Sequence, residues 1–191
     1  MNRWKISFFL LAGIVAAAIV YLFILIGTTA DSDPIPPAKE QTKASHTLTV
    51  SATKEDFEGI ANTFLRRAMK NEPLPVTIEV KDDIMLISEL TVFSYTLPVT
   101  MHFNPNVLED GNILLKQSSL ELGQLNLPPS TVLKVLRDSV KLPEWMLVRP
   151  KEEEIFIDLS DLQISGDIQV KAKEFNLAED EILLEIIIPE D

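Results

Sequence analysis

The chain contains no cysteine, and only two histidines and six glycines, among its 191 residues. Without cysteine there is no disulfide framework, no thiol nucleophile, no thiolate metal site and no cysteine for a lipid anchor. His46 and His102 are too few and too scattered for a zinc site. The isolated glycines form neither a phosphate-binding loop nor a Gly-x-Ser-x-Gly turn. We therefore predict that the protein is not an enzyme and needs no metal or cofactor.

The acidic residues do not change this prediction. The run 152–154 lies near Asp158 and Asp161 but lacks the Asp-x-Asp-x-Asp-Gly pattern of a calcium loop. Two carboxylates three positions apart on a strand point to opposite faces, so Asp158 and Asp161 are not placed to flank one glycosidic bond. A hydrolase that acts on envelope material is therefore the least favoured function.

One uncharged run of 21 residues, Ile6 to Ile26, dominates the N-terminal part of the chain. As a helix it is about 30 Å long, which matches the hydrocarbon core of a bilayer. Arg3 and Lys5 precede it, and basic residues are retained on the cytoplasmic side. We predict an uncleaved transmembrane signal anchor with a cytoplasmic N-terminus. A cleaved secretory signal ending at the small residues 28–30 is the alternative, although its apolar region is usually shorter.

The rest of the chain divides into a stalk and a folded domain. Residues 1–27 form the cytoplasmic N-terminus and the anchor, residues 28–46 a proline-rich stalk, and residues 47–191 an extracytoplasmic domain. The chain has 17 basic and 29 acidic residues, of which the first 30 residues hold two basic and no acidic ones. The remainder therefore carries a net charge of −14, which disfavours nucleic acid as a partner.

The domain alternates between helical and strand periodicity, which predicts an α+β fold. Apolar residues recur at helical spacing over about 54–70 and again from Pro129 to about 142. Alternation with a period of two predicts strands at 47–50, 76–81, 84–103 with a break near Pro98, 113–125, 155–162, 167–173 and 181–188. The connections are too short for parallel crossovers. We therefore expect an N-terminal transmembrane helix, then a curved antiparallel sheet packed with two amphipathic helices.

Three segments resemble a known family. They are Gly-Gln-Leu-Asn-Leu-Pro-Pro at 123–129, Leu-Pro-Glu-Trp-Met at 142–146 and Ile-Phe-Ile-Asp-Leu at 155–159. With the anchor, the stalk and the helix at 57–69, they make nearly the whole chain similar to the YpmS family of bacterial membrane-anchored proteins. The function of that family is unknown, so the resemblance implies no catalytic residues. At the level of the fold, a helix against long curved strands is similar to TULIP-like lipid-binding domains.

Two hypotheses for the function follow, of which the first is a lipid or amphiphile binder at the cell membrane. Long alternating strands, two amphipathic helices and a last strand that is apolar on both faces favour a groove between sheet and helices. The side chains expected to line it are Phe64, Leu86, Phe93, Tyr95, Met101, Phe103, Leu184 and Ile186. The same side chains also suit a solid core, because core and pocket linings share a composition.

The alternative is a non-enzymatic scaffold or accessory subunit that holds another envelope protein. An exposed edge strand or the acidic surface would supply the contact, while the anchor sets the location and the stalk sets the reach. Trp145 and Met146 lie between Pro143 and Pro150 and are a candidate contact patch, because aromatic residues and methionine are enriched in interfaces.

Overall fold

The computed structural model describes residues 3–27, 34–37, 45–70, 75–92, 95–122, 127–162, 164 and 168–190. The chain forms two compact units, Met1–Asp31 and Ser32–Asp191. All strand pairs and all buried core residues of the described chain belong to the second unit. A fragment that begins at Ser32 therefore contains the complete hydrophobic core that a domain needs to fold on its own.

The first unit contains one helix, α1 (Arg3–Gly27), where the sequence predicts a helix at Ile6–Ile26. Its side chains are described at positions 8–18, 20 and 21. Within the described part of the chain, no helix is both long enough and apolar enough to cross a membrane. The membrane-spanning role of residues 6–26 therefore stays a prediction. Most of the predicted stalk lies outside the described residues.

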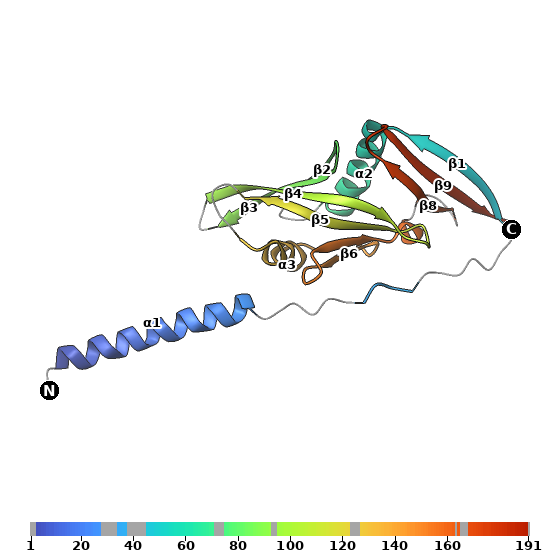
Figure 1. Cartoon of the computed structure of the whole chain (residues 1–191). Coiled ribbons are helices and arrows are strands. Elements are labelled where there is room, and N and C mark those ends of the chain that lie inside the picture. The colour runs from blue at the N-terminus through green and yellow to red at the C-terminus, as the bar shows by residue number, and fades with distance from the viewer. Residues whose placement is uncertain are drawn as a thin grey trace. The chain divides into compact units, whose positions relative to one another are not determined.

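The second unit is an α+β domain built from two antiparallel sheets (Figure 1). The smaller sheet has the strand order β1-β9-β8, with β1 (Ser45–Ala52), β9 (Glu181–Pro189) and β8 (Gln169–Asn176). The larger sheet has the order β2-β3-β4-β5-β7-β6. Its strands are β2 (Val76–Val80), β3 (Ile84–Val92), β4 (Tyr95–Val107), β5 (Ile113–Glu121), β7 (Glu154–Ile157) and β6 (Met146–Arg149).

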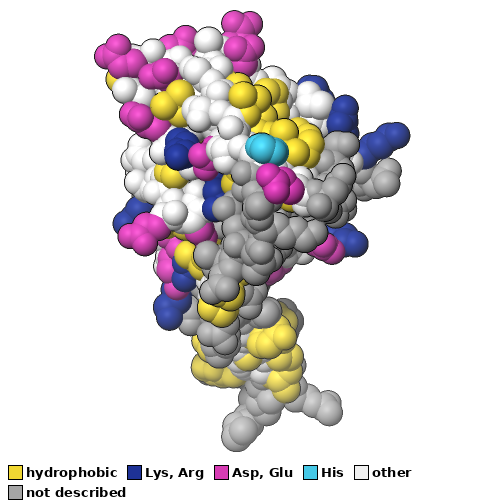
Figure 2. Space-filling view, turned by 90° about the vertical axis from the view of Figure 1, so that its right-hand side faces the viewer, with side chains coloured by type: hydrophobic (Ala, Val, Ile, Leu, Met, Phe, Trp, Pro, Cys, Tyr) yellow, Lys and Arg dark blue, Asp and Glu magenta, His cyan; other side chains and the backbone are white. Residues whose placement is uncertain are grey.

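The prediction of a single sheet is wrong, because the domain has two sheets. The α+β class and the antiparallel pairing are confirmed. The first strand pairs with the last one, from Ser45 opposite Pro189 to Ala52 opposite Ile182. Because β1 pairs with β9, β2 forms the edge of a second sheet and pairs with β3. The side of the domain that bears β1 and β9 shows a cluster of hydrophobic side chains among acidic and basic ones (Figure 2). The first strand also begins at Ser45, two residues earlier than expected.

The predicted strand at 84–103 is a hairpin, and its break is not at Pro98. β3 ends at Val92 and β4 begins at Tyr95, while Pro98 lies inside β4 opposite Glu89. Among the described residues, the pairing of β4 with β5 begins at Thr100, two residues after Pro98.

Two amphipathic helices are confirmed, α2 (Lys54–Ala68) and α3 (Pro129–Ser139). Thr53 caps α2: its hydroxyl oxygen accepts from the Asp56 N–H at 3.1 Å, and the hydroxyl donates to the Asp56 carboxylate at 2.8 Å. This is a variant of the capping box, with aspartate at the third helical position. The buried residues of α3 are Val132, Leu133 and Leu136, and they belong to the hydrophobic core.

The start of α2 is attached to the smaller sheet. The Lys54 N–H donates to the Asp180 carboxylate at 2.8 Å, and the Lys54 ammonium group donates to the Leu177 carbonyl at 3.1 Å. Phe57 and Phe175 of β8 form an edge-to-face pair with ring centroids 5.1 Å apart. These contacts hold the first turns of α2 to β8 and to the turn before β9.

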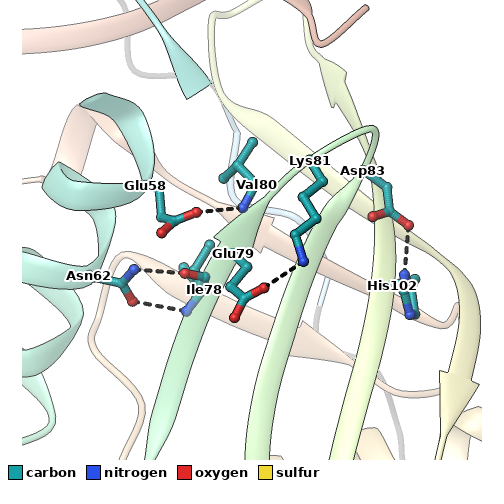
Figure 3. Close-up of polar contacts among 8 residues, drawn as sticks. All are labelled: Glu58, Asn62, Ile78, Glu79, Val80, Lys81, Asp83 and His102. Carbon is teal, nitrogen blue, oxygen red and sulfur yellow. Dashed lines mark hydrogen bonds and ion pairs between the residues drawn. The ribbon is translucent and has the colours of Figure 1, made fainter. Parts of the chain in front are cut away.

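The next turns of α2 are attached to the edge of the larger sheet (Figure 3). The Asn62 amide donates to the Ile78 carbonyl at 2.7 Å and accepts from the Ile78 N–H at 2.9 Å. The Glu58 carboxylate accepts from the Val80 N–H at 2.9 Å. The two side chains therefore occupy the hydrogen-bonding groups that an edge strand otherwise offers to another chain. α2 thus bridges the two sheets.

The sheets also meet at the turn between β4 and β5. In this turn Gly111 has a φ of 86°. Its carbonyl accepts from the Ala172 N–H of β8 at 2.8 Å. A Cβ atom at Gly111 would lie 2.6 Å from the Cβ of Lys171, so only glycine fits this close approach.

We predict that Asn62→Ala lowers the free energy of unfolding by about 1–3 kcal/mol, because it leaves the N–H and the carbonyl of Ile78 without their partners. Urea unfolding of residues 32–191 measures this change. Thr63→Ala is the matched control, since Thr63 bonds only within α2, and we expect it to change the free energy by less than about 0.5 kcal/mol. Equal effects of the two substitutions would contradict the role assigned to Asn62.

Candidate functional site

The two sheets, α2 and the connecting segments line a cavity of about 270 Å³. From α2 come Phe57, Ile60, Ala61 and Phe64; from the smaller sheet come Val50, Ala52, Val170, Leu184 and Ile186. The larger sheet contributes Ile78, Ile84, Leu86, Phe103, Ile113, Leu115, Met146, Ile155 and Ile157, and the connecting segments contribute Trp145, Leu159, Leu162 and Ile164.

All 22 of these lining residues are hydrophobic, and only Trp145 carries a polar side-chain atom. Strand pairing and helical spacing explain why these side chains face the cavity. Cross-strand partners present their side chains on the same face, so Ile84 and Phe103 face the cavity together, as do Val50 and Leu184. On α2, Phe57, Ile60, Ala61 and Phe64 recur at the three- and four-residue spacing of one helix face. Apart from the Trp145 indole N–H group, the wall therefore has no side-chain partner for the polar group of a ligand.

An apolar cavity of this size has a large energetic consequence. At about 24 cal/mol for each Å³ of unfilled volume, 270 Å³ corresponds to roughly 6 kcal/mol. A domain of this length has a total stability of only about 5–15 kcal/mol. Water compensates poorly, because an apolar wall offers it few hydrogen-bonding partners. A hydrophobic occupant that restores the missing contacts would stabilise the folded domain.

Five of the eight predicted groove residues line this cavity: Phe64, Leu86, Phe103, Leu184 and Ile186. Met101 does not. It is buried beside α3, in contact with a separate small space of about 20 Å³ that Val99 and Leu136 also line. Met101 lies on the same sheet face as Leu86, but the spacing of residues does not reveal which helix covers which part of that face. Tyr95 begins β4, its side chain is not among those described, and Phe93 lies outside the described residues.

The sequence-based prediction missed several lining residues, of which Trp145 is the most informative. Met146 is buried and Trp145 is half-buried against the cavity. They therefore do not form an exposed contact patch. The Trp145 carbonyl accepts from the Asp158 N–H at 2.8 Å, which fixes the backbone beside β6 and β7. The predicted strand at 155–162 is shorter in the structure, because β7 ends at Ile157. Instead Leu159–Asp161 forms a 3₁₀ turn, η1.

The polar groups lie away from the cavity wall. His102 bonds to the Asp83 carboxylate through Nδ1 at 2.7 Å (Figure 3), and it alternates in β4 with the core residues Met101 and Phe103. The Asp158 carboxylate accepts from the N–H and the hydroxyl of Ser160 and thereby caps η1. Among the described residues, no group of three or more His, Asp or Glu side chains is placed to hold a metal ion.

The fold and the cavity define the protein as a small α+β domain, preceded by an apolar helix and built around an apolar cavity. The chain belongs to the family described as an uncharacterized protein conserved in bacteria (DUF2140), whose model matches residues 2–188. It is 30% identical over 185 residues to the uncharacterized protein YpmS of Bacillus subtilis (strain 168), with 95% of each chain covered. The resemblance to the YpmS family is therefore confirmed. No solved structure matches the chain, so the similarity to TULIP-like domains stays a prediction.

We predict that residues 32–191 bind the apolar dye N-phenyl-1-naphthylamine in the cavity. The chain has two tryptophans, Trp4 and Trp145, so Trp145 is the only one in this fragment. Its place in the cavity wall should allow energy transfer to the bound dye, seen as sensitised dye emission. In the Trp145→Phe variant the dye should still brighten on binding but lose the sensitised emission. Dye emission that does not change on addition of the protein would show that the cavity is closed to ligands.

Proposed function

We propose that the protein is a membrane-anchored extracytoplasmic binding protein that takes up a lipid or another amphiphile in the cavity between its two sheets. The observation that carries this proposal is the cavity wall, in which 22 residues from four parts of the chain are all hydrophobic. Ligand pockets usually combine such walls with a few polar groups that orient the ligand. Here recognition would depend on the apolar part of the ligand alone.

The size of the cavity favours a binding site over an imperfectly packed core. Protein interiors are packed as densely as organic crystals, and the voids they contain are few and rarely exceed a water molecule in size. A space of about 270 Å³ is far larger than such a void. A bound hydrocarbon chain would recover roughly 0.8 kcal/mol for each buried methylene group. The energetic deficit of the empty domain thereby becomes a driving force for binding.

The location of this activity rests on the N-terminal helix. The uncharged run Ile6–Ile26 has the length and composition of a transmembrane anchor, and α1 extends over it. The basic residues Arg3 and Lys5 before this run favour a cytoplasmic N-terminus and a C-terminal domain outside. We propose binding without catalysis, because the cavity wall offers neither a nucleophile nor a general base.

A second candidate function, as a scaffold for another envelope protein, is favoured by the free edge of β1. Within the described part of the chain, this strand has a single neighbour, β9, and its eight residues include no lysine, glutamate or proline to discourage pairing. The edge of β2, by contrast, is occupied by Asn62 and Glu58. A partner that adds a strand to β1 would use this edge.

We predict that native mass spectrometry of residues 32–191, purified from a bacterial host, shows a stoichiometric ligand that organic extraction identifies as a lipid. Leu184→Trp should lower the occupancy, because the larger ring fills the cavity. Leu183→Trp is the matched control: Leu183 is the adjacent, half-buried residue of β9 and is not part of the cavity wall. A purely apo mass that persists after incubation with envelope lipids would overturn the binding function and favour the scaffold.

We predict that the full chain stays in the membrane after an alkaline carbonate wash, whereas residues 32–191 expressed without the helix are soluble. In intact cells from which the wall has been removed, added protease should degrade the domain and spare a cytoplasmic marker protein. If the mass of the mature protein corresponds to a chain that starts near residue 31, the N-terminal segment is instead a cleaved secretory signal. A domain that is protected from protease would contradict the predicted orientation.

A further inference from the structure

The exposed hydrophobic residues of the domain are not scattered over its surface. Outside α1, five large hydrophobic side chains of the described residues are exposed: Leu48 (56%), Ile60 (51%), Ile164 (45%), Ile188 (42%) and Leu127 (37%). Ile60 and Ile164 themselves belong to the cavity wall. Their high exposure shows that the wall reaches the surface at α2 and at the segment after η1.

Leu48 and Ile188 extend the cavity wall along the smaller sheet. Leu48 pairs with Ile186 and lies two residues before Val50, and Ile188 lies two residues after Ile186. Residues two apart share one face of a strand, so Leu48 and Ile188 lie on the cavity-facing side, just beyond the wall residues Val50 and Ile186. We call Leu48, Ile60, Ile164 and Ile188 the apolar rim.

The same strand face becomes polar one step further out. His46 pairs with Ile188, and its ring contacts the Glu190 carboxylate at 3.4 Å. Along this face the side chains therefore change from cavity wall, through the apolar rim, to an exposed polar pair. Each step of two residues covers about 7 Å. This order matches an amphiphile whose chain lies inside and whose polar end lies in water.

We propose that the apolar rim is the entrance to the cavity, through which a single hydrocarbon chain enters tail first while its polar headgroup stays outside near His46 and Glu190. This inference rests on the proposed function. Burying a headgroup in a wall without hydrogen-bonding partners is unfavourable, which keeps the polar end of the ligand at the surface. The rim lowers the barrier to entry because it keeps the methylene groups in apolar contact as they leave water.

Trp145 provides the measurement, since it lies in the cavity wall and is the only tryptophan of residues 32–191. A brominated fatty acid that reaches the cavity quenches Trp145 emission on contact. Stopped-flow mixing gives the rate of entry, and the final quenching gives the occupancy. We compare the wild-type fragment with the double variant Leu48→Thr/Ile188→Thr, because these two rim residues are not part of the cavity wall. Leu127→Thr is the matched control, because Leu127 is exposed but is not part of the cavity wall.

We expect the double rim variant to load roughly tenfold more slowly than wild type, with final quenching unchanged, while Leu127→Thr behaves as wild type. If the double rim variant loads at the wild-type rate and reaches full final quenching, the proposed entrance is wrong and the binding function remains intact. If Leu127→Thr slows loading as much as the rim substitutions do, the proposed entrance is also wrong, because any loss of surface hydrophobicity would then have the same effect. If the wild-type fragment shows no quenching at any concentration, the binding function itself fails, and the entrance fails with it.

Discussion

The bridge that α2 makes between the two sheets is the constraint on which the rest of the domain depends. Lys54 and Phe57 attach its first turns to β8 and the turn before β9. Asn62 and Glu58 attach its next turns to the backbone of β2. Because both attachments are directional, the helix sets the separation of the sheets as well as joining them. A helix held by apolar contacts alone could settle into the space between the sheets and fill it.

The cavity follows from that separation. The inner faces of the sheets are apolar, as the faces of any two packed sheets are, yet here they do not interdigitate over the whole of their area. α2, Trp145 and the segment after β7 cover part of the gap between the sheets. At the apolar rim the wall continues into exposed leucine and isoleucine side chains. The bonds of Asn62 and Glu58 to β2 therefore have two effects: they occupy the edge of that strand, and they hold the sheets apart so that the apolar space stays open.

Local patterns predicted much of this fold. The helical spacing from Phe57 to Met69 and the alternation in β3, β4 and β9 correctly predicted an antiparallel α+β domain with two amphipathic helices. Five of the eight proposed lining residues lie in the cavity wall, because the apolar face of an element is the face turned inward. Met101 was misplaced because the pattern does not distinguish the part of a face under α3 from the part under α2. The prediction of a single sheet was wrong because β1 pairs with β9, and the paired residues lie 130 or more positions apart in the sequence.

The sequence by itself determined the composition of the protein: an apolar N-terminal helix, an acidic domain without cysteine, and elements whose apolar faces must be buried. These properties depend on neighbouring residues, which interact through the local geometry of helices and strands. Only the tertiary structure decided that the buried faces surround a cavity instead of filling a core. That outcome depends on distances between β1, α2, β6 and β9, and contacts between segments so far apart in the chain leave no periodic signal in the sequence.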